Sequence, residues 1–202
     1  MPTPWHYRDD TLAVRKVCVG SWENNAYVLA CRSTGAAVVI DAAAEADRVV
    51  AATEDVEPLA LLTTHGHFDH VGAAREVADR LDIPFYLNSA DAQTFGLTPD
   101  AWLNSGPIAV GELTLTAIET PGHSPGSVCF TIGGLLFSGD TLFPGGPGAT
   151  SGPGADFTQI MASLEDRLFT LADNTLVLPG HGLDTTIGTE RPHLLEWRAR
   201  GW

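Results

Sequence analysis

Positive charge is scarce in this 202-residue sequence. Lys16 is its single lysine, and Lys and Arg together number 11 against 25 Asp and Glu. The formal net charge is −14, and the basic residues form no cluster. Nucleic acids and anionic membrane surfaces are bound through an excess of Lys and Arg. The composition therefore argues against both classes of partner.

Long hydrophobic runs are also missing. No stretch approaches the roughly 18 unbroken apolar residues of a membrane-spanning helix. Residues 1–5 show no basic region followed by an apolar one, as a secretory signal requires. We therefore expect a cytoplasmic protein. Hydrophobic residues make up 44% of the chain, which is typical of a globular protein with one sizeable core.

Cysteine is the third scarce residue type. Cys18, Cys31 and Cys129 are odd in number, lie far apart and form no Cys-x-x-Cys pair. Each lies in an apolar segment. We therefore expect three buried free thiols rather than a disulfide framework or a thiolate metal site.

Hydrophobic periodicity predicts strands mixed with helices in both halves of the chain. Strands are expected over residues 12–19, 26–31, 36–40, 59–64, 85–87, 112–119, 127–132, 135–138 and 175–178. Helices are expected over residues 45–54, 71–81, 157–171 and 191–200, with a further helical turn at 98–100. Gly133 and Gly134 predict a two-residue hairpin turn, and Asp156 with Gln159 predicts a capping box at the start of a helix.

Residues 144–154 form a glycine-rich segment. It lacks the Lys-Ser/Thr pair of a phosphate-binding loop, and no strand-to-helix context supports one. Two interpretations stay open: a mobile surface loop, or a segment that lines a substrate site.

Histidine is concentrated where the strand at 59–64 ends. His65, His67, Asp69 and His70 place three imidazoles and a carboxylate within six residues. Neutral imidazole and carboxylate are the usual ligands of zinc, iron and manganese. In a curled loop, His65 and His67 can converge on one ion, while Asp69 and His70 point to another.

Three more residues follow predicted strands beside glycines. They are His123 in Pro-Gly-His-Ser, Asp140 in Ser-Gly-Asp-Thr and His181 in Pro-Gly-His-Gly. Five imidazoles and two carboxylates exceed what one ion of about four to six ligands can use, but two ions with one bridging carboxylate use them all. His6 and His193 lie outside any such context, and we expect both at the surface.

These motifs resemble those of the metallo-β-lactamase superfamily in order and approximate spacing. The resemblance is strongest to its glyoxalase II-like short forms and covers nearly the whole chain. It implies an α+β fold, a four-layer αββα sandwich with the metal site at one edge of the two sheets. It also implies a single domain over residues 1–202, without a separate C-terminal helical domain.

The resemblance further implies which residues bind metal. His65, His67 and His123 would hold one ion, Asp69, His70 and His181 a second, and Asp140 would bridge them. The implied cofactors are two divalent ions, most simply zinc, with iron or manganese as alternatives. A metal-bridging hydroxide would then cleave a small acyl thioester, and Asp69 would act as a catalytic residue by orienting it.

The chain departs from hydroxyacylglutathione hydrolases where the thiol would bind. A Gly-Arg-Thr-Asp-Phe segment often follows the bridging Asp in that family, whereas here residues 148–157 contain extra glycines and no Arg. A glutathione carboxylate would need such a cation, so the thiol stays open.

Two alternative activities fit the same residues. One is lactone or ester hydrolysis. The other is a persulfide dioxygenase with one iron held by His65, His123 and Asp140. Such dioxygenases usually carry Asp-Tyr after the last His, where this chain has Gly182-Leu183.

Overall fold

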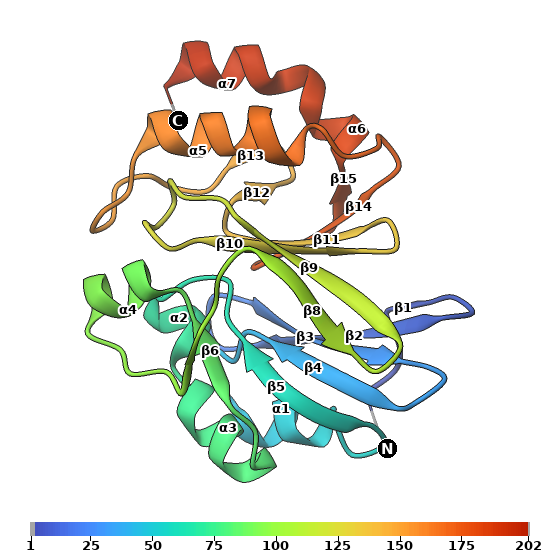
Figure 1. Cartoon of the computed structure of the whole chain (residues 1–202). Helices are drawn as coiled ribbons and strands as arrows, with labels where there is room; N and C mark the ends of the chain where they lie inside the picture. The colour runs from blue at the N-terminus through green and yellow to red at the C-terminus, as the bar shows by residue number, and fades with distance from the viewer. Residues whose placement is uncertain (1–2, 202) are drawn as a thin grey trace.

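The computed structural model describes residues 3–201. Two mixed β-sheets lie face to face, and helices cover the outer face of each sheet (Figure 1). The layers therefore run helix, sheet, sheet, helix. This is the α+β sandwich of four layers predicted from the sequence, so the fold class is confirmed.

The first sheet places seven strands side by side in chain order. They are β1 (Tyr7–Arg8), β2 (Leu12–Val19), β3 (Asn24–Cys31), β4 (Ala36–Ile40), β5 (Glu57–Leu62), β6 (Phe85–Leu87) and β7 (Ala101–Trp102). Strands β4 to β7 are parallel. The connections are α1 (Ala46–Ala51), then α2 (Phe68–Val71) with α3 (Ala74–Leu81), then α4 (Ser89–Phe95). Because parallel strands end at the same edge, the segments that follow β4 and β5 meet there.

The second sheet has the order β15-β14-β11-β10-β9-β8. Its strands are β8 (Gly106–Val110), β9 (Leu113–Glu119), β10 (Val128–Ile132), β11 (Leu135–Gly139), β14 (Leu176–Pro179) and β15 (Thr185–Thr186). Strands β11 and β14 are parallel. Asp140 and His181, which follow them, therefore emerge at one edge of this sheet.

The segment between β11 and β14 crosses the outer face of the second sheet. It contains the small hairpin of β12 (Leu142–Phe143) and β13 (Gly146–Pro147), then α5 (Phe157–Ser163) and a π-helical segment, Leu164–Leu168. After β15 follow α6 (Ile187–Glu190), a 3₁₀ turn (Arg191–His193) and α7 (Leu194–Arg200).

Three apolar clusters hold the layers together. Val49 of α1 and Val77 of α3 pack on the first sheet, Leu29 and Phe137 lie between the sheets, and Trp197 of α7 packs with α5 on the second sheet. Each fully buried side chain of this size contributes about 1.5–3 kcal/mol. Because both faces of the first sheet are covered, β3 is buried at every position and lacks polar alternation.

Several predicted boundaries move. Strand β5 ends at Leu62, so Thr63 and Thr64 lie in the loop. The expected helix at 71–81 is broken at Gly72, where an added Cβ would meet the Ala43 carbonyl oxygen at 2.6 Å. The prediction of a helical turn at 98–100 is wrong. A helix lies earlier, as α4, capped by the Asn88 side chain, which accepts the Ala90 N–H at 2.9 Å.

Half of the capping box predicted at Asp156 and Gln159 is present. The Asp156 carboxylate accepts the Gln159 N–H at 3.0 Å, but the Asp156 N–H donates to the Gly122 carbonyl oxygen and not to the Gln159 side chain. The prediction for Cys18 is wrong: Cys31 and Cys129 are buried, but Cys18 is exposed. It shares a face of β2 with Lys16, and this face reaches solvent near the end of the strand. Within residues 3–201 no helix is long and apolar enough to cross a membrane.

Candidate metal centre

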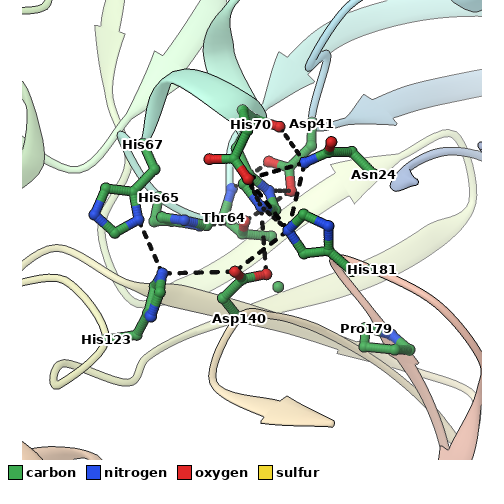
Figure 2. Close-up of polar contacts among 12 residues, drawn as sticks. Asn24, Asp41, Thr64, His65, His67, His70, His123, Asp140, Pro179 and His181 are labelled. Carbon is green, nitrogen blue, oxygen red and sulfur yellow. Dashed lines mark hydrogen bonds and ion pairs between the residues drawn. The ribbon is translucent and has the colours of Figure 1, made fainter. Parts of the chain in front are cut away.

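The predicted ligands gather at the edge where the two sheets end (Figure 2). His65 and His67 lie in the loop after β5, and His67 precedes the first helical residue of α2. Asp69 and His70 lie in the helix itself, not in a curled loop as expected. His123 comes from the turn between β9 and β10, and Asp140 and His181 follow β11 and β14.

All seven predicted residues come together in overlapping groups. His65, His67 and His123 form one group, and Asp69, His70 and His181 form another. A third group, His65, His70 and Asp140, connects these two. Within each group the ligand atoms lie within 4.8 Å of one another, so each can surround a cation.

The first group presents nitrogen atoms from three rings to a common point. His67 Nδ1 lies 2.9 Å from His123 Nε2. The His65 ring stands edge-on to both, with centroid separations of 4.8 Å and 4.7 Å. His65 Nε2 is buried and makes no hydrogen bond. A buried polar atom without a partner is costly, and a cation at this point would satisfy it.

The second group is equally close. His181 Nε2 lies 3.2 Å from His70 Nε2 and 3.3 Å from Asp69 Oδ2. His70 is almost fully buried, whereas about a fifth of the Asp69 and His181 side chains is exposed. The second group is therefore open to solvent on the side of Asp69 and His181.

Asp140 lies between the two groups. Its Oδ1 is 3.3 Å from His70 Nε2, and its Oδ2 is 3.6 Å from His123 Nε2 and 3.5 Å from His181 Nε2. Only a glycine fits beside it at residue 180, because an added Cβ there would lie 2.3 Å from Asp140 Oδ1. This position suits a carboxylate that bridges two cations.

Hydrogen bonds on the far side of the rings fix their orientation. The Nδ1–H groups of His123 and His181 donate to the carbonyl oxygens of Ala149 (2.7 Å) and Trp22 (2.8 Å). His70 Nδ1–H donates to Asp41 Oδ2 at 2.8 Å. Each bond leaves the Nε2 lone pair directed at the centre, as metal-binding imidazoles require. Sequence reasoning did not identify these partners.

Asp41 is a buried residue of the site that the sequence did not reveal. Its Oδ1 accepts the Thr64 N–H, and its Oδ2 accepts the Thr64 hydroxyl, both at 2.7 Å. Since the Thr64 proton goes to Asp41, the Thr64 oxygen accepts from His65 Nδ1 at 3.1 Å. Asp41 therefore orients His70 directly and His65 through Thr64.

Asp91 is the second such residue, fully buried at the start of α4. Its Oδ2 accepts from the Gly66 N–H and the Ser124 hydroxyl, each at 2.7 Å. Its Oδ1 accepts from the Gly126 N–H at 2.6 Å. Gly66 lies between His65 and His67, and Ser124 follows His123. One carboxylate therefore holds both loops that carry the first group.

The charges of the second group suit a divalent cation. Burial lowers the pKa of His70, but Asp140 and Asp41 outweigh it and raise this pKa well above its ordinary value. Burial likewise opposes the rise at His181, where hydrogen bonds to Asp140 and Asp69 raise the pKa to about 10. Burial raises the pKa of Asp140, yet His70 and His181 hold it well below its usual range. The carboxylates thus stabilise positive charge here, which a metal ion supplies in place of protons.

The glycine-rich segment lines the centre. Ala149 accepts the His123 hydrogen bond described above. An added Cβ at Gly148 would lie 1.9 Å from the Asp140 carbonyl oxygen, and one at Gly152 would lie 3.4 Å from His67 Nε2. Of the two interpretations of this segment, the geometry supports the site-lining one. His6 and His193 are exposed, as predicted.

Sequence comparisons agree with this geometry. The profile of the Metallo-beta-lactamase superfamily matches residues 19–181. The probable metallo-hydrolase YqgX of Bacillus subtilis is 35% identical in an alignment 202 positions long, which covers 88% of this chain and 93% of YqgX. The hydroxyacylglutathione hydrolase GloC of Haemophilus influenzae is 35% identical over 178 residues, covering 77% of this chain and 84% of GloC.

Solved structures share the fold. The BLEG-1 B3 metallo-beta-lactamase superposes with a TM-score of 0.80 at 34% identity, covering 89% of this chain and 97% of its own. A di-iron-bound form of TTHA1623 superposes with a TM-score of 0.77 at 37% identity, covering 87% of this chain and 96% of its own. ETHE1 from Myxococcus xanthus superposes with a TM-score of 0.77 at 27% identity, covering 90% of this chain and 82% of its own.

Proposed function

The chain belongs to the metallo-beta-lactamase superfamily, and on that premise we propose that it is a dinuclear metal-dependent hydrolase of small acyl thioesters. The observation that carries the proposal is the pair of ligand groups with Asp140 between them. Side chains that served only to stabilise the fold would not need to form two sets of convergent imidazole nitrogens.

We assign one ion to His65, His67 and His123, and the other to Asp69, His70 and His181, with Asp140 as ligand to both. Divalent cations held by these residues would lower the pKa of a bound water and polarise the substrate carbonyl. Zinc suits this donor set, and iron and manganese suit it as well. The di-iron form of TTHA1623 keeps iron as a specific alternative.

The protein's own residues orient the reactants. The Asn24 side-chain amide donates to the backbone oxygen of Asp69 and, at 3.2 Å, to its carboxylate. This holds Asp69 at the open side of the centre. There its carboxylate can accept a hydrogen bond from the attacking water and align it with the carbonyl carbon. His65 and His70, buried behind it, act only as fixed ligands.

A thioester suits this centre because a thiolate leaves without strong acid assistance. A thiol has a pKa of about 8.5, far below that of an alcohol. The rings of His65, His70, His123 and His181 each make a hydrogen bond through Nδ1 and direct Nε2 at the cluster, so none of these four is placed to act as general acid. The GloC relative, a hydroxyacylglutathione hydrolase, also supports thioester chemistry.

Metal removal tests the proposal. The purified protein is expected to hold about two divalent ions per chain by elemental analysis, because two ligand groups are complete. Chelation is expected to reduce thioester hydrolysis at least about 100-fold, and adding back zinc, iron or manganese singly to restore it.

Two results would contradict this assignment. One iron per chain with oxygen uptake on glutathione persulfide would establish the dioxygenase alternative. Turnover of lactones but of no thioester would establish the lactone or ester hydrolase alternative.

A further inference from the structure

A small apolar pocket of about 170 Å³ adjoins the centre on its open side. Three segments form it: the turn between β2 and β3, the segment that follows β4, and the start of α2. Its lining residues include Trp22, Asn24, Ala43, Ala44, Phe68 and Asp69. Asp69 is therefore part of both the pocket wall and the second ligand group.

Two large aromatic side chains of the pocket lie in water. Trp22 is 67% exposed and Phe68 is 81% exposed. Phe68 stands directly between the predicted ligands His67 and Asp69. Exposed aromatic surface that converges on a site gains free energy when a ligand covers it, at about 25 cal/mol per Å². The pocket is thus suited to an apolar group.

The pocket is firmly attached to the centre. The Trp22 carbonyl oxygen accepts the His181 Nδ1–H at 2.8 Å. Asn24, at the pocket floor, donates to Asp69. A group that enters this pocket therefore lies next to the reacting atoms and stays fixed relative to them.

The pocket offers no cationic side chain to an anionic occupant. The lining residues include no Lys or Arg. Lys16 is held by Asp184 and the Gly182 carbonyl oxygen. At the rim, Glu45 accepts the Gly20 N–H and pairs with Arg48. A glutathione carboxylate would therefore meet no Lys or Arg side chain in this pocket.

We propose that this pocket binds the acyl chain of the substrate, and that the substrate class is thioesters of short apolar acyl groups of roughly four to six carbons. A methylene group is about the size of a water molecule, whose share of liquid volume is about 30 Å³, so the pocket volume of about 170 Å³ has room for roughly six such groups. Carrier thiols are larger than the pocket, so the thiol lies outside it. The inference rests on the proposed hydrolase function. The reaction forms a C–O bond from water and breaks the C–S bond, releasing thiol, carboxylate and one proton.

The test compares chain lengths on one uncharged thiol. Acetyl, butyryl, hexanoyl and decanoyl thioesters of N-acetylcysteamine are assayed with metal-loaded protein, beside lactoylglutathione. We expect kcat/KM to rise at least about tenfold from acetyl to hexanoyl and to fall again at decanoyl. Ketone analogues, with CH₂ in place of sulfur, are titrated calorimetrically into metal-free protein. The hexanoyl analogue is expected to bind at least about tenfold more tightly than the acetyl analogue.

Two variants test whether the preference for hexanoyl over acetyl groups arises from the pocket. Phe68→Ala and Trp22→Ala are each expected to lower the hexanoyl-to-acetyl ratio about tenfold, in both turnover and analogue binding. Trp102→Ala is the matched control, because Trp102 is also an exposed aromatic residue (58%) but lies on β7, outside the pocket. It is expected to leave the ratio unchanged.

The outcomes separate the two proposals. If analogue affinity does not depend on chain length, or if lactoylglutathione is the preferred substrate, the acyl-chain inference is wrong even when thioesters are hydrolysed. If analogue affinity depends on chain length but no thioester is hydrolysed, the hydrolase function is wrong and the pocket remains a site for apolar groups.

Discussion

Replacing Asp69 with alanine is expected to lower kcat for thioester hydrolysis on the order of 10³-fold, because it removes several kcal/mol of transition-state stabilisation. It is also expected to reduce bound metal from about two ions per chain towards one. The reason is geometric: Asp69 contributes the carboxylate of the second group but is absent from the first. Steady-state kinetics and elemental analysis of the same preparation measure both effects.

This variant leaves the fold intact. About a fifth of the Asp69 side chain is exposed, so its truncation opens no apolar cavity. The thermal unfolding midpoint of the metal-free protein is therefore expected to change little. Asp79→Ala, on the exposed face of α3, is the control for loss of a surface carboxylate. Full activity with two bound ions in Asp69→Ala would show that the two-metal assignment is wrong.

Replacing Asp91 with alanine is expected to have the largest effect on stability. Two backbone N–H groups and one hydroxyl lose their acceptor in a buried place, and each unpaired group costs about 1–3 kcal/mol. We expect the free energy of unfolding of the metal-free protein to fall by about 3–5 kcal/mol, measured by urea titration. Gln93→Ala, on the exposed side of the same helix, is the control.

Metal binding separates a positioning role of Asp91 from a merely structural one. The carboxylate holds the loops of His65, His67 and His123, and does not touch Asp69, His70 or His181. Metal affinity is therefore expected to fall at least about tenfold for one of the two ions and much less for the other. Asp91→Asn, which keeps one acceptor oxygen, is expected to fall between wild type and Asp91→Ala. Equal loss at both ions would contradict this role.

The identity of the substrate's thiol does not follow from the relatives. GloC is a hydroxyacylglutathione hydrolase, but similarity at 35% identity leaves the residues around the centre free to differ. In this chain the pocket beside Asp69 is apolar and holds no Lys or Arg. The substrate therefore has to be identified from turnover of defined thioesters, with acyl chain and thiol varied separately.

The seven residues that gather at the centre could be predicted from the sequence because their signals are local. His65, His67, Asp69 and His70 share one short segment, and His123, Asp140 and His181 each follow a strand beside glycine. Strand ends of a sheet meet at one edge, so residues far apart in the chain share a site without any pairwise signal. The family resemblance added the order of the layers, with two sheets packed face to face between helices, and the structure has this order.

Tertiary structure alone decided how those ligands are held. Asp41 and Asp91 carry no recognisable motif, and their partners lie 23 to 35 residues away. The acceptors of His123 and His181 are backbone oxygens, which every residue has, so no side-chain type identifies them. Cys18 was misplaced for a related reason, because an apolar segment does not tell which part of a strand stays uncovered. The sequence by itself determined which side chains gather at the centre, through residue types at local spacing. The fold decided its rigidity, its open side and its apolar pocket, because these depend on contacts between segments that have no sequence pattern in common.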